Sequence, residues 1–95
     1  MKPTLIIEYC PKCNWLMRAS WMAQEMLTTF NDDLQGVLLK PSEVNGRYTI
    51  CIDEKKIFDR KENGGFPEIK ELKQWVRDIV APGRSLGHAD RKLHE

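Results

Sequence analysis

The hydrophobic positions of this chain recur with strand and helix periods that predict one α/β unit. Residues 4–9 are rich in β-branched and aromatic side chains and carry apolar residues on both sides, which is typical of an interior strand covered on both faces. Residues 13–31 then carry an apolar position every three to four residues, which predicts an amphipathic helix. Its predicted apolar stripe consists of Trp15, Leu16, Ala19, Met22, Ala23, Met26, Leu27 and Phe30.

The apolar pattern of the remaining sequence predicts three more strands and one more helix. Short apolar runs at 37–39, 48–52 and 57–58 are expected to be strands, with Pro41 ending the first of them. A second helix is expected from Pro67 to Val80, with its apolar face formed by Ile69, Leu72, Trp75, Val76, Ile79 and Val80.

The predicted element order is therefore β-α-β-β-β-α. A strand-helix-strand run of about 30 residues favours a right-handed crossover between two parallel strands, and the third and fourth strands are expected to form an antiparallel hairpin. The expected fold is an α/β domain over residues 1–81 with a four-stranded mixed sheet and two helices. Residues 82–95, with His88 and His94, are expected to be a solvated tail.

Composition and charge exclude several classes of function. The chain has 95 residues, 41% hydrophobic and 31% charged, which fits one folded domain. Its formal net charge of +1 provides no strong field for nucleic acid or anionic lipid, so we expect neither partner. The early apolar run Leu5–Ile7 is too short for a signal peptide or a membrane span, so we expect a cytoplasmic protein.

The candidate chemistry lies in Cys10-Pro11-Lys12-Cys13, where the first strand passes into the first helix. Two cysteines at this spacing exchange disulfides when one is a thiolate and the other can resolve the mixed disulfide. A helix N-terminus and the cation of Lys12 both favour the thiolate. Closing so short a loop adds little stability, so the pair is better explained as a reversible switch than as a structural crosslink.

Two metal-binding interpretations remain open for the same motif. Structural zinc needs four ligands, and beyond the pair the chain offers only Cys51, His88 and His94 as further Cys or His ligands. Heavy-metal modules also place such a motif after a first strand, but on a βαββαβ fold whose last strand this chain lacks. We expect no cofactor, and we expect Cys51 to be a small buried hydrophobe within its strand, the alternative being a regulatory thiol.

The whole pattern resembles the selenoprotein W/T/H family of Rdx-type thioredoxin-like proteins, and specifically its Cys-containing bacterial members. The resemblance covers residues 4–81 and rests on four features: Tyr9-Cys10 closing the strand, the Cys-x-x-Cys motif, Asn45-Gly46-Arg47-Tyr48, and the run from Arg60-Lys61 through Gly64-Gly65-Phe66-Pro67-Glu68. It implies a thioredoxin-like sheet with two helices and a thiol-dependent redox activity. Many members carry selenocysteine at the position of Cys13, whereas in thioredoxin the first cysteine attacks, so the attacking residue stays open.

Other segments are candidates for substrate or partner contact. Thioredoxins place a cis-proline before the third strand, and the chain has Asn45-Gly46-Arg47 there instead, with Gly46 expected in a turn and Arg47 able to pair with a carboxylate. Met17 and Trp21 lie one turn apart outside the apolar stripe. We expect them to form an exposed patch that docks a partner or a second subunit, the alternative being that the tail covers them.

The sequence thus predicts a small thiol–disulfide oxidoreductase or redox sensor that uses Cys10 and Cys13, with a protein disulfide or glutathione as substrate. Two other hypotheses remain. One is an interaction module whose dithiol state gates binding without turnover, and the other is a metal-binding protein.

Overall fold

The computed structural model describes residues 1–87. In chain order, the elements are β1 (Thr4–Tyr9), the one-turn 3-10 helix η1 (Pro11–Cys13), α1 (Leu16–Phe30), β2 (Gly36–Pro41), β3 (Tyr48–Ile52), β4 (Lys55–Asp59), α2 (Arg60–Asn63) and α3 (Ile69–Val80).

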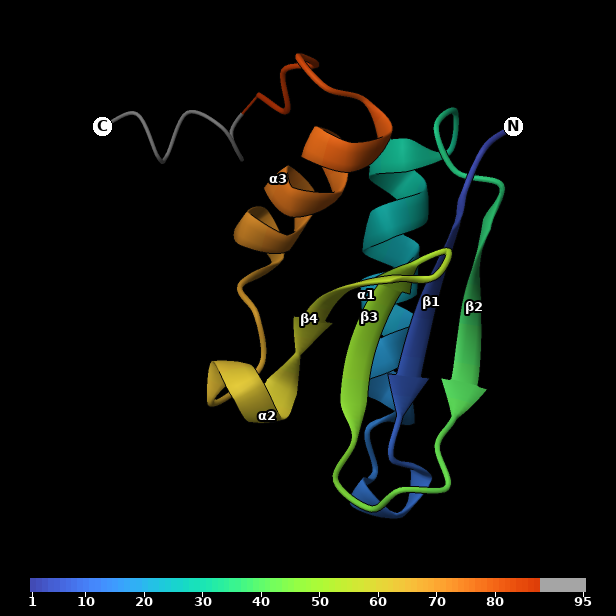
Figure 1. Ribbon diagram of the computed structural model, residues 1–95, viewed down its shortest axis with the longest axis vertical. Helices are drawn as coiled ribbons and strands as arrows, with labels where there is room; N and C mark the ends of the chain where they lie inside the picture. The colour runs from blue at the N-terminus through green and yellow to red at the C-terminus, as the bar shows by residue number, and fades with distance from the viewer. Residues whose placement is uncertain (88–95) are drawn as a thin grey trace.

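The four strands form one mixed sheet in the order β2-β1-β3-β4 (Figure 1). β1 is parallel to β2 and antiparallel to β3, while β3 and β4 form an antiparallel hairpin. Ile7 of β1 has Leu39 as its partner on one side and Ile50 on the other. The predicted mixed sheet, the parallel crossover and the interior position of β1 are therefore confirmed.

Helices cover one face of this sheet, so the molecule has two layers. Figure 1 shows α1 behind the strands, with α3 beside it at the upper left, above β4 and α2. Along β1, Leu5, Ile7 and Tyr9 are buried while the alternate residues are half-buried. The prediction that this strand is covered on both faces is wrong, because a run of apolar residues does not distinguish a covered face from an open one. The buried core consists of Leu5, Ile7, Tyr9, Ala19, Met22, Ala23, Met26, Phe30, Leu34, Tyr48, Ile50, Ile52, Phe58, Leu72 and Val76.

The open face of the sheet carries Cys51. Its Cα partner on β1 is Ile6, whose own partner on β2 is Leu38. Leu38 is 50% exposed, and both Ile6 and Cys51 are half-buried. The expectation that Cys51 is a buried core residue is wrong, because strand alternation directs it away from the helices.

Helix α1 begins later than expected. Asn14 adopts a left-handed conformation with φ 60°, which separates η1 from α1, and Trp15 is the N-cap residue of α1. The predicted stripe is buried at five positions of the helix, Ala19, Met22, Ala23, Met26 and Phe30. Leu16 and Leu27 lie at its margins and are 49% and 39% exposed, so their assignment to the core is wrong.

The segment between β4 and α3 contains a helical turn that the sequence pattern does not reveal. Asp59 caps α2 by accepting a hydrogen bond from the Lys61 backbone N–H at 3.0 Å, and Gly64 ends this turn with φ 78°. Helix α3 begins at Ile69 rather than at Pro67 because Glu68, its N-cap residue, is extended. Leu72 and Val76 form the buried face of α3, whereas Ile79 is 37% exposed.

The start of the predicted tail contacts the body of the protein. The Arg84 guanidinium pairs with Asp33 and donates to the Thr29 carbonyl oxygen at 2.8 Å, and Leu86 packs against the core. The rest of the predicted tail, including His88 and His94, lies outside the described residues. Within residues 1–87, no helix has the length and apolar character needed to cross a bilayer.

Candidate active site

The cysteine pair lies at the end of β1, where η1 folds the chain back on itself. Cys10 is the N-cap residue of η1 and Cys13 is its last residue, and the two Cα atoms are 5.4 Å apart. This separation is within the range that disulfides require, and the two sulfurs are bonded. The Cys13 backbone N–H donates to the Cys10 carbonyl oxygen at 3.3 Å, which closes the turn.

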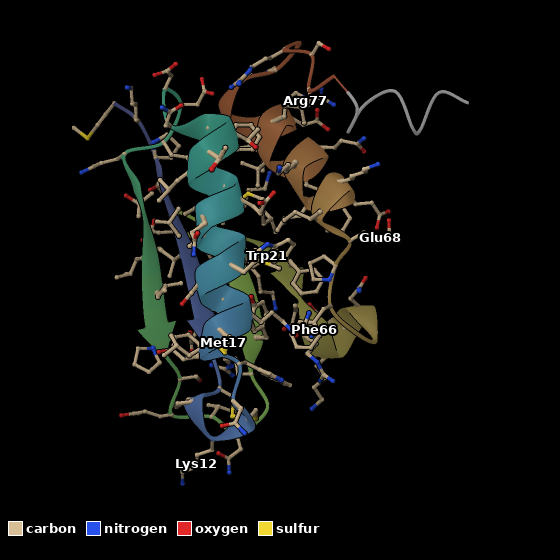
Figure 2. All side chains as sticks on the ribbon, turned by 180° about the vertical axis from the view of Figure 1, so that it is seen from behind. Lys12, Met17, Trp21, Phe66, Glu68 and Arg77 are labelled. Carbon is tan, nitrogen blue, oxygen red and sulfur yellow. A yellow bond between two sulfur atoms is a disulfide. The ribbon has the colours of Figure 1, made fainter. Side chains whose placement is uncertain are left out.

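The two cysteines differ in how solvent reaches them. Cys10 is 1% exposed and belongs to the buried interior, whereas Cys13 is half-buried. Pro11 and Lys12 between them are exposed, and Figure 2 shows Lys12 at the tip of the molecule. Of the two cysteines, Cys13 is therefore the one that solvent reaches more easily.

The helix that follows the pair is more distant from it than the sequence predicts. The first α-helical hydrogen bond of α1 runs from the Ala19 N–H to the Trp15 carbonyl oxygen, so the free N–H groups of its first turn follow Cys13 by several residues. The effect of a helix dipole declines within about one turn, and of the two cysteines Cys13 lies nearer in sequence to the start of α1.

Three aromatic rings from distant segments form a wall beside the pair. Trp15 follows the dithiol turn directly, and Tyr48 is the register partner of Tyr9, which precedes Cys10. Phe66 lies edge-to-face against both of these rings, at 5.0 Å from each centroid, and Trp15 and Tyr48 are 6.0 Å apart. The contacts of these rings join the start of α1, the start of β3 and the segment before α3.

The Tyr48 hydroxyl is buried behind this wall. It donates to the Met22 sulfur at 3.4 Å. Burial raises the pKa of Tyr48 above its usual value, and the nearby positive charge of Arg18 only partly opposes this shift. Tyr48 is therefore neutral at physiological pH and acts here as a packing residue, not as a base.

Two arginines lie over the aromatic wall. The Arg18 guanidinium carbon is 3.9 Å from the Phe66 ring centroid, and that of Arg60 is 4.9 Å from the same centroid and 4.7 Å from that of Trp15. These are cation–π distances. The Arg60 Nε is shielded from solvent and has no hydrogen-bond partner among residues 1–87.

The α2 turn holds Arg60 in this place, and Asp59 stabilises the turn. The hydrogen bond from Lys56 lowers the pKa of Asp59 below its usual value, and the Lys61 N–H acts in the same direction. A carboxyl whose folded-state pKa is depressed contributes stability above its unfolded pKa, and this contribution is lost as the pH falls through the folded value.

Replacing Asp59 by alanine is therefore expected to cost about 1 kcal/mol of unfolding free energy at pH 7. The difference from the parent protein should narrow as the pH falls below 4, because the parent then loses the same charge. Urea denaturation at a series of pH values measures this. A difference that stays constant down to pH 2.5 would contradict the electrostatic part of the explanation.

The β2–β3 loop lies at the same end of the sheet as the dithiol turn. The Ser42 N–H donates to the Tyr9 carbonyl oxygen at 2.7 Å, which ties the loop to the residue before Cys10. Gly46 has φ 80°, as expected for its predicted turn. Arg47 pairs with Glu8 at 3.5 Å, and Glu8 also accepts a 2.7 Å hydrogen bond from the Ser42 hydroxyl. A hollow beside the loop is lined by Glu8, Lys40, Pro41, Glu43, Val44 and Arg47.

Met17 and Trp21 are exposed on the first half of α1. Met17 is 85% exposed and Trp21 is 47% exposed. Figure 2 shows both on the same side of the helix, with Met17 nearer the dithiol end. The described start of the tail packs elsewhere, at Thr29 and Asp33, so it does not cover them.

The chain matches the family model of Rdx over residues 4–78. The chain belongs to the Rdx family. A crystal structure of a selenoprotein W-related protein from Vibrio cholerae is 44% identical, covers 84% of this chain and 99% of that one, and has a TM-score of 0.80. A crystal structure of a protein from Bordetella parapertussis is 49% identical, covers 82% and 98% of the two chains, and has a TM-score of 0.79. No curated protein matches the chain.

The selenoprotein W-like resemblance is thus confirmed, together with the Rdx fold. Within residues 1–87, no three side chains of His, Cys, Asp or Glu lie close enough to hold a metal ion. The features that the sequence missed are the contacts of Arg18, Arg60 and Phe66 beside the cysteine pair. The run from Arg60 to Phe66 contributes to the family resemblance, but its sequence pattern predicts only a tight loop and a helix start, not these contacts.

Proposed function

We propose that this Rdx protein is a thiol–disulfide oxidoreductase in which Cys13 exchanges with the substrate and Cys10 resolves the mixed disulfide. The observation that carries this proposal is the bonded pair, with Cys10 at 1% exposure and Cys13 half-buried. A substrate sulfur reaches the more accessible cysteine, while the buried one is held ready for the second step.

In the proposed reaction, the Cys13 thiolate attacks one sulfur of a substrate disulfide and forms a mixed disulfide, releasing the first substrate thiolate. The Cys10 thiol then loses its proton and attacks the Cys13 sulfur. The second substrate thiol leaves, and the Cys10–Cys13 disulfide forms. The protein is oxidised by two electrons and the substrate is reduced by two. The substrate class is a protein disulfide or glutathione disulfide, and the proposed compartment is the reducing cytoplasm.

The neighbours of the pair support this sequence of steps. The positive charge of Lys12, exposed beside Cys13, favours its thiolate. The turn at Asn45 and Gly46 is proposed to contact the substrate backbone, because its loop is tied to Tyr9, the residue before Cys10, and no atom lies within 4 Å of where a Cβ of Gly46 would be. Arg47 is already paired with Glu8, so in this proposal it holds the loop and does not bind the substrate carboxylate.

A single-turnover experiment tests the proposal. Fully reduced, metal-free protein is mixed with one equivalent of a model protein that contains one disulfide. The reaction is quenched in acid, free thiols are alkylated, and the products are identified by mass spectrometry. We expect one substrate disulfide to be reduced for each Cys10–Cys13 disulfide formed. Binding of the substrate without any transfer of electrons would instead favour the gated interaction module.

A second role is favoured by the exposure of Met17 and Trp21. We propose that this patch docks a second copy of the chain or a partner, since two large apolar side chains one turn apart beside a reactive site suit an interface.

Replacing Trp21 by alanine is expected to reduce self-association at least about tenfold in sedimentation equilibrium, the usual size of a hot-spot loss. Leu38→Ala is the matched control, since Leu38 is equally exposed but lies on the open face of the sheet. An unchanged association constant in Trp21→Ala, together with unchanged partner binding, would remove this role.

A further inference from the structure

Arg18 and Arg60 approach one aromatic ring from two different elements. Arg18 lies on the first turn of α1 and Arg60 is the first residue of α2. Their guanidinium carbons are 3.9 Å and 4.9 Å from the Phe66 centroid, so both cations contact the same ring. The negative face of an aromatic ring attracts a cation, which favours the placement of both side chains here.

Three acidic side chains on α1 and around α2 pair with lysines. Asp59 and Glu62 both pair with Lys56, and Glu25 pairs with Lys73. In the part of the chain that the structure describes, neither Arg18 nor Arg60 forms an ion pair. The two guanidinium groups thus carry positive charge that no carboxylate of residues 1–87 neutralises in a direct ion pair.

The contacts with the rings also determine which arginine atoms remain available to bind a ligand. A guanidinium lying against a ring keeps its edge free for in-plane hydrogen bonds, and two parallel N–H groups match the two oxygens of a carboxylate. The Arg60 Nε is buried without a partner in the described part of the chain, so the contact with Trp15 and Phe66, not a hydrogen bond, holds this side chain.

The position of this pair relates it to the dithiol. Trp15, which Arg60 overlies, is separated from Cys13 by one residue, and Figure 2 shows Phe66 at about the height of Met17, with Lys12 below both at the tip of the molecule. The two arginines thus contact aromatic rings on the side of Cys13 where α1 begins. Disulfide-bearing peptides carry carboxylates within a few residues of the cysteine, either on an acidic side chain or at a C-terminus.

We propose that Arg18 and Arg60, supported by Phe66, form a carboxylate-binding subsite that selects acidic disulfide substrates for Cys13. The proposal rests on the proposed function for its substrate class. It makes the two arginines binding residues that contact the substrate and take no part in the exchange of sulfur bonds.

Rates of single-turnover reduction test the subsite. Reduced protein is mixed with the disulfide dimer of acetyl-Cys-Gly-Asp-amide or of acetyl-Cys-Gly-Asn-amide, and a second pair compares acetyl-Cys-Gly with a free or an amidated C-terminus. We expect the acidic member of at least one pair to react about five- to tenfold faster at low ionic strength, with the preference declining in salt. The pair that shows it distinguishes a side-chain carboxylate from a terminal one.

The variants are chosen to separate this subsite from general charge. Arg18→Gln combined with Arg60→Gln should abolish the preference, so that within this variant the acidic and the neutral peptide react at the same rate. Lys61→Gln removes an equal charge next to Arg60 and should keep most of the preference. Arg60→Lys should recover only part of it, because an ammonium lacks the planar fork.

Two outcomes overturn the subsite: equal rates for acidic and neutral peptides, or an equal loss of preference in Lys61→Gln. A separate binding measurement distinguishes failure of the subsite proposal from failure of the proposed function. The S-methylated acidic peptide cannot exchange disulfides, and its binding is followed by amide chemical shifts. If these shifts occur in the parent but not in the double variant, while neither peptide is reduced, the subsite stands and the oxidoreductase proposal fails.

Discussion

Replacing Cys10 by serine is expected to trap the protein as a mixed disulfide through Cys13, whereas replacing Cys13 by serine should slow reaction with a disulfide substrate by about 100-fold or more. The reason is their different burial. Cys13 stays accessible in the first variant but has no partner to release the substrate, and Cys10 in the second is 1% exposed. Reactions quenched at a series of times, alkylated and analysed by intact mass would measure both the amount of mixed disulfide and the reaction rate.

The control for these variants is Cys51→Ser. Cys51 lies on the open face of the sheet, opposite the helices, so its loss should change neither the rate nor the mixed disulfide. A Cys13→Ser variant that forms a stable adduct through Cys10 at the parental rate would reverse the assignment of the two cysteines.

The largest expected effect on stability comes from Phe30, the last residue of α1. Its side chain is fully buried, and Phe30→Ala is expected to cost about 3–5 kcal/mol of unfolding free energy through lost burial and the cavity left behind. A domain of this size is stable by about 5–15 kcal/mol in total. Urea denaturation at pH 7 should therefore show a large decrease in midpoint for a protein that still folds in the cold.

Leu27→Ala is the matched control on the same helix. Leu27 belongs to the same sequence periodicity but is 39% exposed, and its loss should cost less than about 1 kcal/mol. Equal costs for the two variants would contradict the assignment of the buried face of α1.

Periodicity was sufficient to predict most of the fold. The four strands, their mixed pairing and the two long helices follow from where apolar residues recur, because each element must bury one side. Periodicity does not specify which of two apolar faces a second layer covers. This is why the open face with Ile6, Leu38 and Cys51 was not foreseen.

The candidate site was predictable only where it is local in sequence. Cys10 and Cys13 are three positions apart, so their chemistry follows from their spacing and from the turn that joins them. Trp15, Tyr48 and Phe66 come from three distant segments, and their contact depends on how the hairpin and the α2 turn pack on α1. Each of them alone has the pattern of an ordinary core or loop residue.

The difference between the two cysteines has the same origin. Strand alternation does not extend beyond Tyr9, so the burial of Cys10 is set by packing at the end of β1. The 3-10 turn and the left-handed conformation of Asn14 leave Cys13 nearer to solvent. The helical periodicity of the sequence continues through these residues, so it reveals neither feature.

The central claim is that Cys10 and Cys13 form a reversible two-electron couple. A glutathione redox titration of the metal-free full chain tests it most directly, with thiols alkylated at each point and the products located by mass. We predict one Cys10–Cys13 disulfide that forms and disappears reversibly within the cytosolic range of potentials, with Cys51 alkylated throughout. Failure of this disulfide to form at any ratio of reduced to oxidised glutathione would contradict the claim.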